Sequence, residues 1–186
     1  PAVNTVSATT TSLTDSTVTG TFDNFTGGAG NDAFVANANN LLLTGDTVDG
    51  GAGTDSISSR HTVTTGATIS ASLNNIENHT LRIDHDGGGA DVFTYDMADM
   101  SGVSTLKLDR LNNTGTTADA VVTISGTGFT QSVTTEISGG DTAADNSSVD
   151  VTLTYQGAAG SGDSASLIFD GAGANVVTVA GMETLN

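Results

Sequence analysis

The stretch Gly27-Gly28-Ala29-Gly30-Asn31-Asp32-Ala33-Phe34-Val35 fits the pattern Gly-Gly-x-Gly-x-Asp-x-apolar-x at every position. Residues 50–58, Gly-Gly-Ala-Gly-Thr-Asp-Ser-Ile-Ser, fit it a second time. The glycines permit positive φ values and let main-chain carbonyls turn inward, while the aspartate adds a carboxylate. The apolar residue after the aspartate begins a buried strand. Each nonapeptide therefore encodes a turn, an oxygen ligand and the start of a core strand.

The remainder of the chain has the composition of strands and turns. Short runs rich in Thr, Val and Ile are separated by Gly, Asn and Asp, which is typical of β-strands joined by tight turns. Apolar and polar residues alternate over 133–137 and 151–155. Helical spacing occurs only at Met97 and Met100 and over residues 36–43. The sequence therefore predicts an all-β fold with one or two helical turns.

The composition limits both the core and the partners. Hydrophobic residues make up 36% of the 186 residues and aromatic residues 4%, against a formal net charge of −17. So small an apolar content in so charged a chain indicates that something besides hydrophobic burial supports the fold. Lys and Arg total 4, too few to neutralise a run of phosphates, so we expect no nucleic-acid partner. The longest aliphatic stretch is residues 41–43, so we expect no membrane insertion.

The residue patterns of common catalytic sites do not occur. Glu77 and His79 lack the spacing of a zinc-hydrolase helix, and the sequence has no Gly-x-Ser-x-Gly elbow. Cys does not occur either, which excludes a disulfide scaffold and a thiolate metal site. His61, His79 and His85 are scattered, and we expect surface or loop positions for them. We therefore expect no enzymatic activity.

The acidic residues indicate a metal. Eighteen of the 21 acidic residues are Asp, and a short carboxylate beside glycines suits a tight loop that holds a hard cation through oxygen. Two alternatives stay open, namely Asp as a turn residue of a β protein and adaptation of the surface to salt. The candidate carboxylate ligands are Asp32, Asp46, Asp49, Asp55, Asp84, Asp86 and Asp91.

The spacing of the two nonapeptides differs from that of consecutive repeats. Gly27 and Gly50 are 23 residues apart, whereas repeats in a regular β-roll follow every nine, so we expect the regular stacking to be broken. Either the intervening segment loops out and the turns still stack, or each turn finds other ligands. We favour the second for the second motif, because Asp46 and Asp49 immediately precede its glycines. Residues 84–91 form a third candidate site, with a plain hairpin loop as the alternative.

Residues 24–34 and 45–57 resemble the repeats-in-toxin (RTX) class of type I-secreted bacterial proteins. Residues 75–78 and 181–186 resemble strand phrases of the calcium-dependent surface-layer (S-layer) proteins in that class. The resemblance implies secretion without an N-terminal signal, folding triggered by external calcium, and an extracellular place at the cell surface. It places Ca²⁺ on Asp32 and Asp55, with carbonyl ligands from Gly27, Ala29, Gly50 and Ala52.

Internal similarity indicates a repetitive architecture. The phrase at residues 102–107 returns at 181–186 and, more loosely, at 75–78, so we expect a tandem or solenoid arrangement that continues past Asn186. The expected fold is a calcium-binding β-roll or β-solenoid-like module, with a β-sandwich-like C-terminal part left open. The expected division is a linker or edge strand over 1–25, an RTX-like calcium-binding β module over 26–112, and a second β-rich part over 113–186.

The expected function is structural. We expect a module of a calcium-dependent S-layer or filament, whose partners are copies of itself and a cell-surface polysaccharide. A calcium-rigidified adhesin segment that binds a glycan or a host surface is the alternative. Particle size with and without calcium distinguishes the two, because only the first predicts a calcium-driven lattice or filament.

Overall fold

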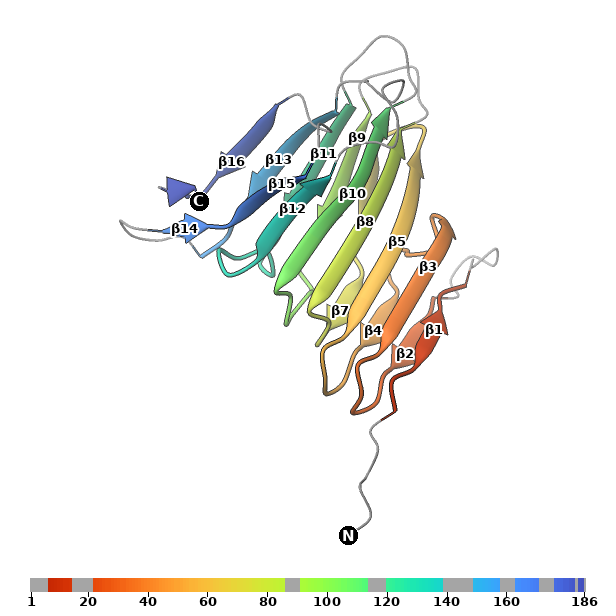
Figure 1. Ribbon diagram of the computed structural model, residues 1–186. Coiled ribbons are helices and arrows are strands. Elements are labelled where there is room, and N and C mark those ends of the chain that lie inside the picture. The colour runs from red at the N-terminus through yellow and green to blue at the C-terminus, as the bar shows by residue number, and fades with distance from the viewer. Residues whose placement is uncertain are drawn as a thin grey trace.

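The fold is a parallel β-solenoid of about five turns. The computed structural model describes residues 7–14, 22–85, 91–113, 120–138, 149–157, 163–170, 176–182 and 184–185, and these contain strands and turns but no helix (Figure 1). The largest sheet has seven strands, each parallel to its neighbours. In spatial order they are β1 (Thr10–Ser12), β3 (Ala33–Asn39), β5 (Ser56–Val63), β8 (Asn78–His85), β10 (Thr105–Asn113), β12 (Thr134–Ser138) and β15 (Leu167–Asp170).

Three smaller sheets complete the coils. The five-stranded sheet contains β6 (Ala67–Ile69), β9 (Val92–Asp96), β11 (Ala120–Ser125), β13 (Val149–Thr154) and β16 (Val177–Ala180). The three-stranded sheet contains β2 (Asn24–Thr26), β4 (Thr47–Asp49) and β7 (Ser72–Asn74), and the two-stranded sheet contains β14 (Ser164–Ala165) and β17 (Thr184–Leu185). One coil thus runs from β5 through β6 and β7 back to β8 in the seven-stranded sheet. The prediction of an all-β, solenoid-like fold is confirmed.

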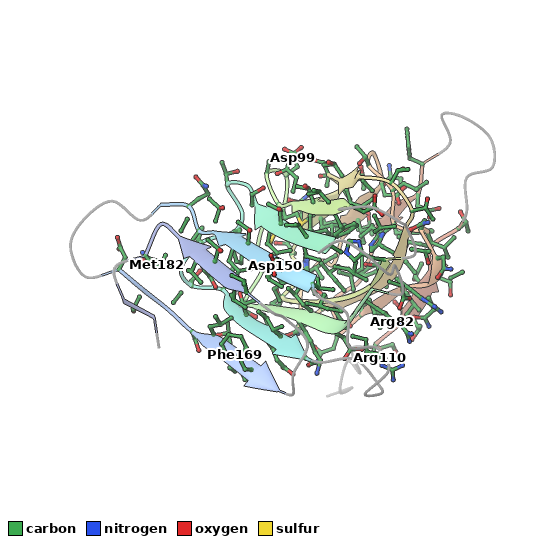
Figure 2. All side chains as sticks on the ribbon, turned by 90° about the horizontal axis from the view of Figure 1, so that it is seen from above. Arg82, Asp99, Arg110, Asp150, Phe169 and Met182 are labelled. Carbon is green, nitrogen blue, oxygen red and sulfur yellow. The ribbon has the colours of Figure 1, made fainter. Side chains whose placement is uncertain are left out.

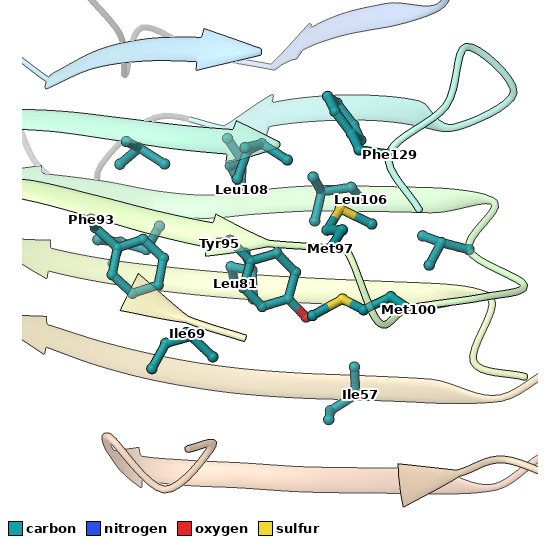
Figure 3. Close-up of a cluster of buried hydrophobic side chains, with 14 of the residues drawn as sticks. Ile57, Ile69, Leu81, Phe93, Tyr95, Met97, Met100, Leu106, Leu108 and Phe129 are labelled. Atoms are coloured by element: carbon teal, nitrogen blue, oxygen red, sulfur yellow. The ribbon is translucent and has the colours of Figure 1, made fainter. Parts of the chain in front are cut away.

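The core lies between the seven-stranded and five-stranded sheets. Along β5 the side chains alternate between half-buried and buried, so that Ile57 and Val63 point inward. Phe93 and Tyr95 point into the same space from β9 (Figure 3). Farther along, the rings of Phe129 and Tyr155 stack with centroids 4.2 Å apart. Because parallel coils place equivalent residues in register, a modest number of apolar side chains forms continuous rows.

His61 and His79 belong to this core, and His85 at the end of β8 is buried as well, so the expectation of surface or loop positions is wrong for all three histidines. His79 is 1% exposed, and its Nδ1 lies 3.0 Å from the Tyr95 hydroxyl oxygen. His61 is equally buried, packs against the Phe93 ring, and has Nε2 3.0 Å from the Ser59 hydroxyl oxygen. Burial lowers the pKa of each imidazole to about 4. Both side chains are therefore neutral at pH 7.

The predicted helical turns are not helices. Met97 and Met100 flank a tight turn after β9, closed by a hydrogen bond from the Met100 amide to the Met97 carbonyl. Residues 36–39 belong to β3, and the chain then turns at Asn40, which has a φ of 59°. Met97 and Met100 are three residues apart because their side chains enter the core on either side of a turn. The same spacing also fits the period of a helix, which is why the sequence indicates one.

The repeated phrases mark one kind of turn. Asn75, Gly102 and Gly181 have φ values of 52°, 84° and 84°, and each stands three positions before a strand, namely β8, β10 and β17. A positive φ favours Gly or Asn, which explains the residue types. The similarity among residues 75–78, 102–107 and 181–186 therefore arises because each segment begins with the turn that precedes the next strand.

The coils lengthen along the chain. Residues that are hydrogen-bonded between adjacent coils are 23 positions apart at Asp32 and Asp55 but 29 apart at Lys107 and Glu136. The seven-stranded sheet is continuous across residue 113, and β1 is its N-terminal edge. No helix in the described part of the chain could span a membrane.

Candidate functional site

The two glycine turns lie directly on one another. The Gly27 amide donates to the Asp49 carbonyl at 2.7 Å, and the Ala52 amide donates to the Gly28 carbonyl at 2.9 Å. The expectation that the 23-residue interval breaks the regular stacking is therefore wrong, and the alternative in which the turns still stack is the one that the structure has. The interval equals one whole coil, because the residues between the motifs supply the other sides of the solenoid, and the turns meet again after it.

A row of acidic side chains, here called the carboxylate ladder, crosses these turns. Its members are Asp32, Asp55 and Glu77, and each accepts a hydrogen bond from a main-chain amide one coil earlier. The donors are the amides of Thr9, Asp32 and Asp55, each at 2.6 Å. Hydrogen bonds from amides to carboxylates are stronger than those between neutral groups. The ladder thus joins successive coils beside the glycine turns.

The two motifs differ in how their aspartates are satisfied. Asp32 accepts from the Thr9 hydroxyl and amide through Oδ1 and from the Gly28 amide, at 2.6 Å, through Oδ2. These bonds, led by the one from the Thr9 hydroxyl, lower the pKa of Asp32. Asp55 is fully buried, yet its Oδ2 has no hydrogen-bond partner. An unsatisfied buried group of this kind costs on the order of 1–3 kcal/mol or more, so Asp55 Oδ2 is the atom that an additional ligand would satisfy.

The first glycine of each motif lies in close contact with oxygen atoms of its own turn and of the next coil, an arrangement here called an oxygen niche. A Cβ on Gly27 would collide with the Gly50 carbonyl oxygen and stand 2.6 Å from Asp32 Oδ2. A Cβ on Gly50 would collide in the same way with the Asn75 carbonyl oxygen and stand 2.5 Å from Asp55 Oδ2. Each niche therefore combines a carboxylate from its own turn with a carbonyl from the next coil.

Asp46 and Asp49 lie close to the same turns in different roles. Asp46 is buried and accepts from the Leu43 amide at 2.7 Å and from the Asp23 amide at 3.0 Å. Burial raises its pKa, although these two hydrogen bonds oppose the change. Asp49 accepts from the Gly51 amide at 3.0 Å and from the Asn75 side chain at 2.8 Å. Only Asp49 therefore contacts residues beside the Gly50 niche.

The third candidate site lies at the end of β8. Asp84 Oδ2 is 2.8 Å from Arg60 Nε and 3.3 Å from Arg82 Nε. Asp91 Oδ2 is buried without a hydrogen-bond partner, and Asp86 lies outside the described residues. Asp84 is thus already committed to two arginines, whereas Asp91 retains an unsatisfied oxygen. A metal at this site stays a prediction.

Three contributors to the glycine-turn site were not among the predicted ligands, namely Thr9, Asn75 and Glu77. Glu77 stands 22 residues after Asp55, almost the same interval as between Asp32 and Asp55. That interval is the signal that would have found it. Among the described residues, no three His, Cys, Asp or Glu side chains are grouped to hold one metal ion. A cation in a niche would therefore depend on carbonyl oxygens in addition to a carboxylate.

In comparisons with known proteins, no family model matches the chain, and neither a curated protein nor a solved structure is significantly similar.

Proposed function

We propose that this chain is a calcium-stabilised structural module of an extracellular assembly, of the S-layer or filament kind, with turns of the RTX type. The observation that carries the proposal is the buried, unpaired Asp55 Oδ2 beside the Asn75 carbonyl in the Gly50 niche. Calcium takes its ligands from carboxylate and carbonyl oxygens and tolerates varied geometry. A buried carboxylate oxygen without a donor is stabilised by such a cation.

The residues fit the ion better at the second turn than at the first. Asp55 would hold it with the Asn75 carbonyl and with the predicted carbonyl ligand of Ala52, whereas the Gly50 carbonyl lies against Gly27 in the first niche. Asp32 is a weaker ligand, because amides and a hydroxyl already occupy both of its oxygens. Bound calcium supplies positive charge between two coils of a chain whose formal net charge is −17, which relieves self-repulsion.

The solenoid supports a mechanical role rather than a catalytic one. Successive coils are joined by parallel ladders along the seven-stranded sheet and by the carboxylate ladder beside it, so the coils form one stiff stack. Copies of the same chain are the proposed partners, at the cell surface. We propose no enzymatic activity for it.

Calcium is expected to raise the melting temperature. At a free concentration ten times the dissociation constant, one site stabilises the fold by about 1.4 kcal/mol, which is roughly 3–6 °C for a chain of this length. Thermal melts followed by circular dichroism, in 10 mM CaCl₂ and in excess chelator, measure the shift. Equal melting temperatures in the two buffers contradict the proposal.

Asp55→Asn is the matched variant for this test. It removes the anionic oxygen but keeps an acceptor for the Asp32 amide, so the calcium-dependent part of the shift is expected to fall by at least half. Asp99→Asn makes the same change of charge at an exposed site in the turn after β9 and is expected to keep the full shift. A full calcium response in Asp55→Asn would show that calcium does not bind in the Gly50 niche.

Assembly is tested by particle size. Light scattering of the wild-type protein is expected to show a jump to large, ordered species when millimolar calcium is added. A monomer at all calcium concentrations, together with binding on a glycan array, would favour the adhesin alternative instead.

A further inference from the structure

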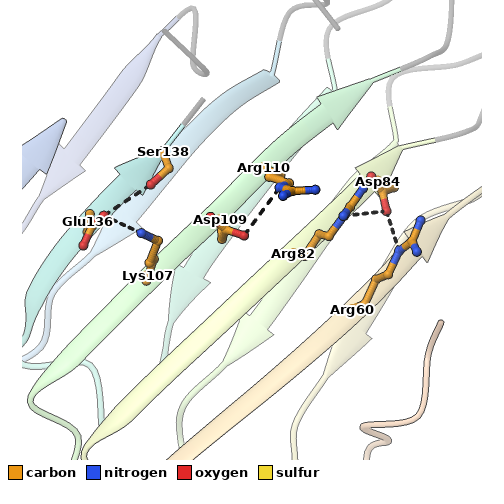
Figure 4. A network of polar contacts seen from close by, with 8 residues as sticks. All are labelled: Arg60, Arg82, Asp84, Lys107, Asp109, Arg110, Glu136 and Ser138. Carbon is orange, nitrogen blue, oxygen red and sulfur yellow. Dashed lines mark hydrogen bonds and ion pairs between the residues drawn. The ribbon is translucent and has the colours of Figure 1, made fainter. Parts of the chain in front are cut away.

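The positive charges of the protein gather on one face. All four cationic side chains, Arg60, Arg82, Lys107 and Arg110, stand on the adjacent strands β5, β8 and β10 of the seven-stranded sheet, each about one-third exposed (Figure 4). Arg82 and Arg110 lie on the side of the molecule opposite Asp99 (Figure 2). In a chain with 21 acidic residues, this clustering creates one region able to attract an anion.

Arg60 and Arg82 form an unusual pair within this face. They are directly opposite each other in the β5–β8 register, and like charges in that position repel across a sheet. A single oxygen, Asp84 Oδ2, pairs with both Nε atoms, at 2.8 and 3.3 Å, so that one negative charge faces two positive ones. Among the described residues, none pairs with the terminal nitrogens of either guanidinium. Several N–H donors thus remain for a second anion.

A cavity of about 220 Å³ opens at the same place. Its volume is below the 300–1,000 Å³ of typical small-molecule sites, which suits one charged group and the ring that carries it. Uncharged polar groups flank the guanidiniums, and Asp109 adds an acceptor. The lining includes Asn37, Ser58, Arg60, Thr80, Arg82 and Asp109.

This combination suits a ligand that carries one anionic group together with several hydroxyl groups. Guanidinium groups bind carboxylates through paired N–H donors. The hydroxyls of Ser58 and Thr80 and the Asp109 carboxylate can exchange hydrogen bonds with several hydroxyl groups of the same ligand. A simple carboxylic acid would leave those groups unused, and a neutral sugar would leave the arginines unused. A sugar that carries a carboxylate uses both sets.

We propose that the Arg60–Arg82 cavity binds a carboxylate-bearing sugar residue of a cell-surface polysaccharide. The inference deepens the proposed function by naming the surface to which the assembly attaches, and it is independent of where calcium binds. A second copy of the chain is the alternative occupant, which the experiment below distinguishes from the sugar.

The test is a titration of the full chain with glucuronate at constant ionic strength in calcium-free buffer, in which no calcium-driven assembly broadens the signals. Because the chain has only three arginines, their Nε–Hε signals can be followed individually in ¹H–¹⁵N NMR spectra. The signals of Arg60 and Arg82 are expected to shift with saturation, while that of Arg110 stays fixed. Glucose and acetate are expected to bind at least tenfold more weakly than glucuronate. Acetate binding as tight as that of glucuronate, or no shift at all, overturns the proposal.

Matched variants separate the cavity from general electrostatics. Arg82→Gln is expected to weaken glucuronate binding at least tenfold, and Arg82→Lys, which keeps the charge but not the planar fork, at least threefold. Lys107→Gln makes the same charge change on the neighbouring strand and is expected to stay within twofold of the wild type. Equal losses in Arg82→Gln and Lys107→Gln would show non-specific attraction.

Two further readouts keep the outcomes distinct. A melting curve of every sample shows whether a variant is folded, with Arg82→Lys as the milder substitution. If the Arg60 and Arg82 signals move with protein concentration in the absence of sugar, the occupant is a second copy and the sugar assignment is wrong. The absence of a calcium effect on melting would refute the proposed calcium role, but not sugar binding to the folded chain.

Discussion

Lowering the pH from 7 to 5 is expected to destabilise the folded protein by about 4 kcal/mol, roughly 2 kcal/mol for each of His61 and His79. Both imidazoles are buried in the core, and burial lowers the pKa of each from 6.5 to about 4. The unfolded chain therefore binds protons between pH 6.5 and 4, while the folded chain does not. Stability is fully present above pH 6.5 and is lost as the pH falls toward 4.

Thermal melts between pH 7.5 and 5 at constant calcium measure this effect. The melting temperature is expected to fall by about 10 °C. In the double variant His61→Gln/His79→Gln, the protein is less stable at pH 7, because the contacts with Tyr95 and Phe93 are lost, but the slope between pH 7 and 5 flattens. An unchanged slope in the double variant would assign the acid sensitivity to other groups.

Gly50→Ala is expected to cost about 3 kcal/mol, at the upper end of the range for forced overpacking. The new methyl group would meet the Asn75 carbonyl and Asp55, both of which belong to tightly stacked turns. The same methyl group would displace the two oxygen atoms of the Gly50 niche. The variant is therefore expected to lose its calcium response together with its stability, which melts with calcium and with chelator measure in one experiment.

Gly66→Ala is the control for that substitution. Its Cβ would meet no atom closer than the Val92 carbonyl oxygen at 3.5 Å, an ordinary contact, and Gly66 has no left-handed backbone. Its stability is expected to stay within about 0.5 kcal/mol of the wild type or to rise slightly. Equal stability of Gly50→Ala and Gly66→Ala would contradict the close contact of Gly50 with the Asn75 carbonyl and Asp55.

The amino-acid sequence predicts strands and the two glycine turns correctly, whereas its helical spacing at residues 97–100 and 36–43 is not helix in the structure. Alternation of polar and apolar residues predicts strands such as β13, and the nonapeptides predict turns that end at Asp32 and Asp55, as the structure has them. Both signals are short-range, because a strand or a turn is encoded by adjacent residues. The stacking of those turns does not follow from such signals, because it depends on the coil length, which the residues between the motifs determine.

The buried histidines and the arginine pair escape prediction for different reasons. His61 and His79 share the inward faces of β5 and β8 with apolar residues, so period-two alternation indicates their burial, although a histidine considered by itself does not. The Arg60–Arg82 pair arises because 22 residues separate its members, the same interval that joins Asp55 to Glu77. Once the coil length is known, the Arg60–Arg82 and Asp55–Glu77 pairs can be predicted from the sequence. Without the coil length, no sequence signal connects the two members of either pair.

The 23-residue coil also makes the molecule extensible in equal steps. Residues 33–55 leave the seven-stranded sheet and return to the same register one strand farther on. A duplicated copy of this segment would therefore insert one more strand and lengthen the stack by about 4.8 Å without changing its width. Evolution or a protein engineer could thus adjust the reach of this protein in increments, simply by the number of segments it carries.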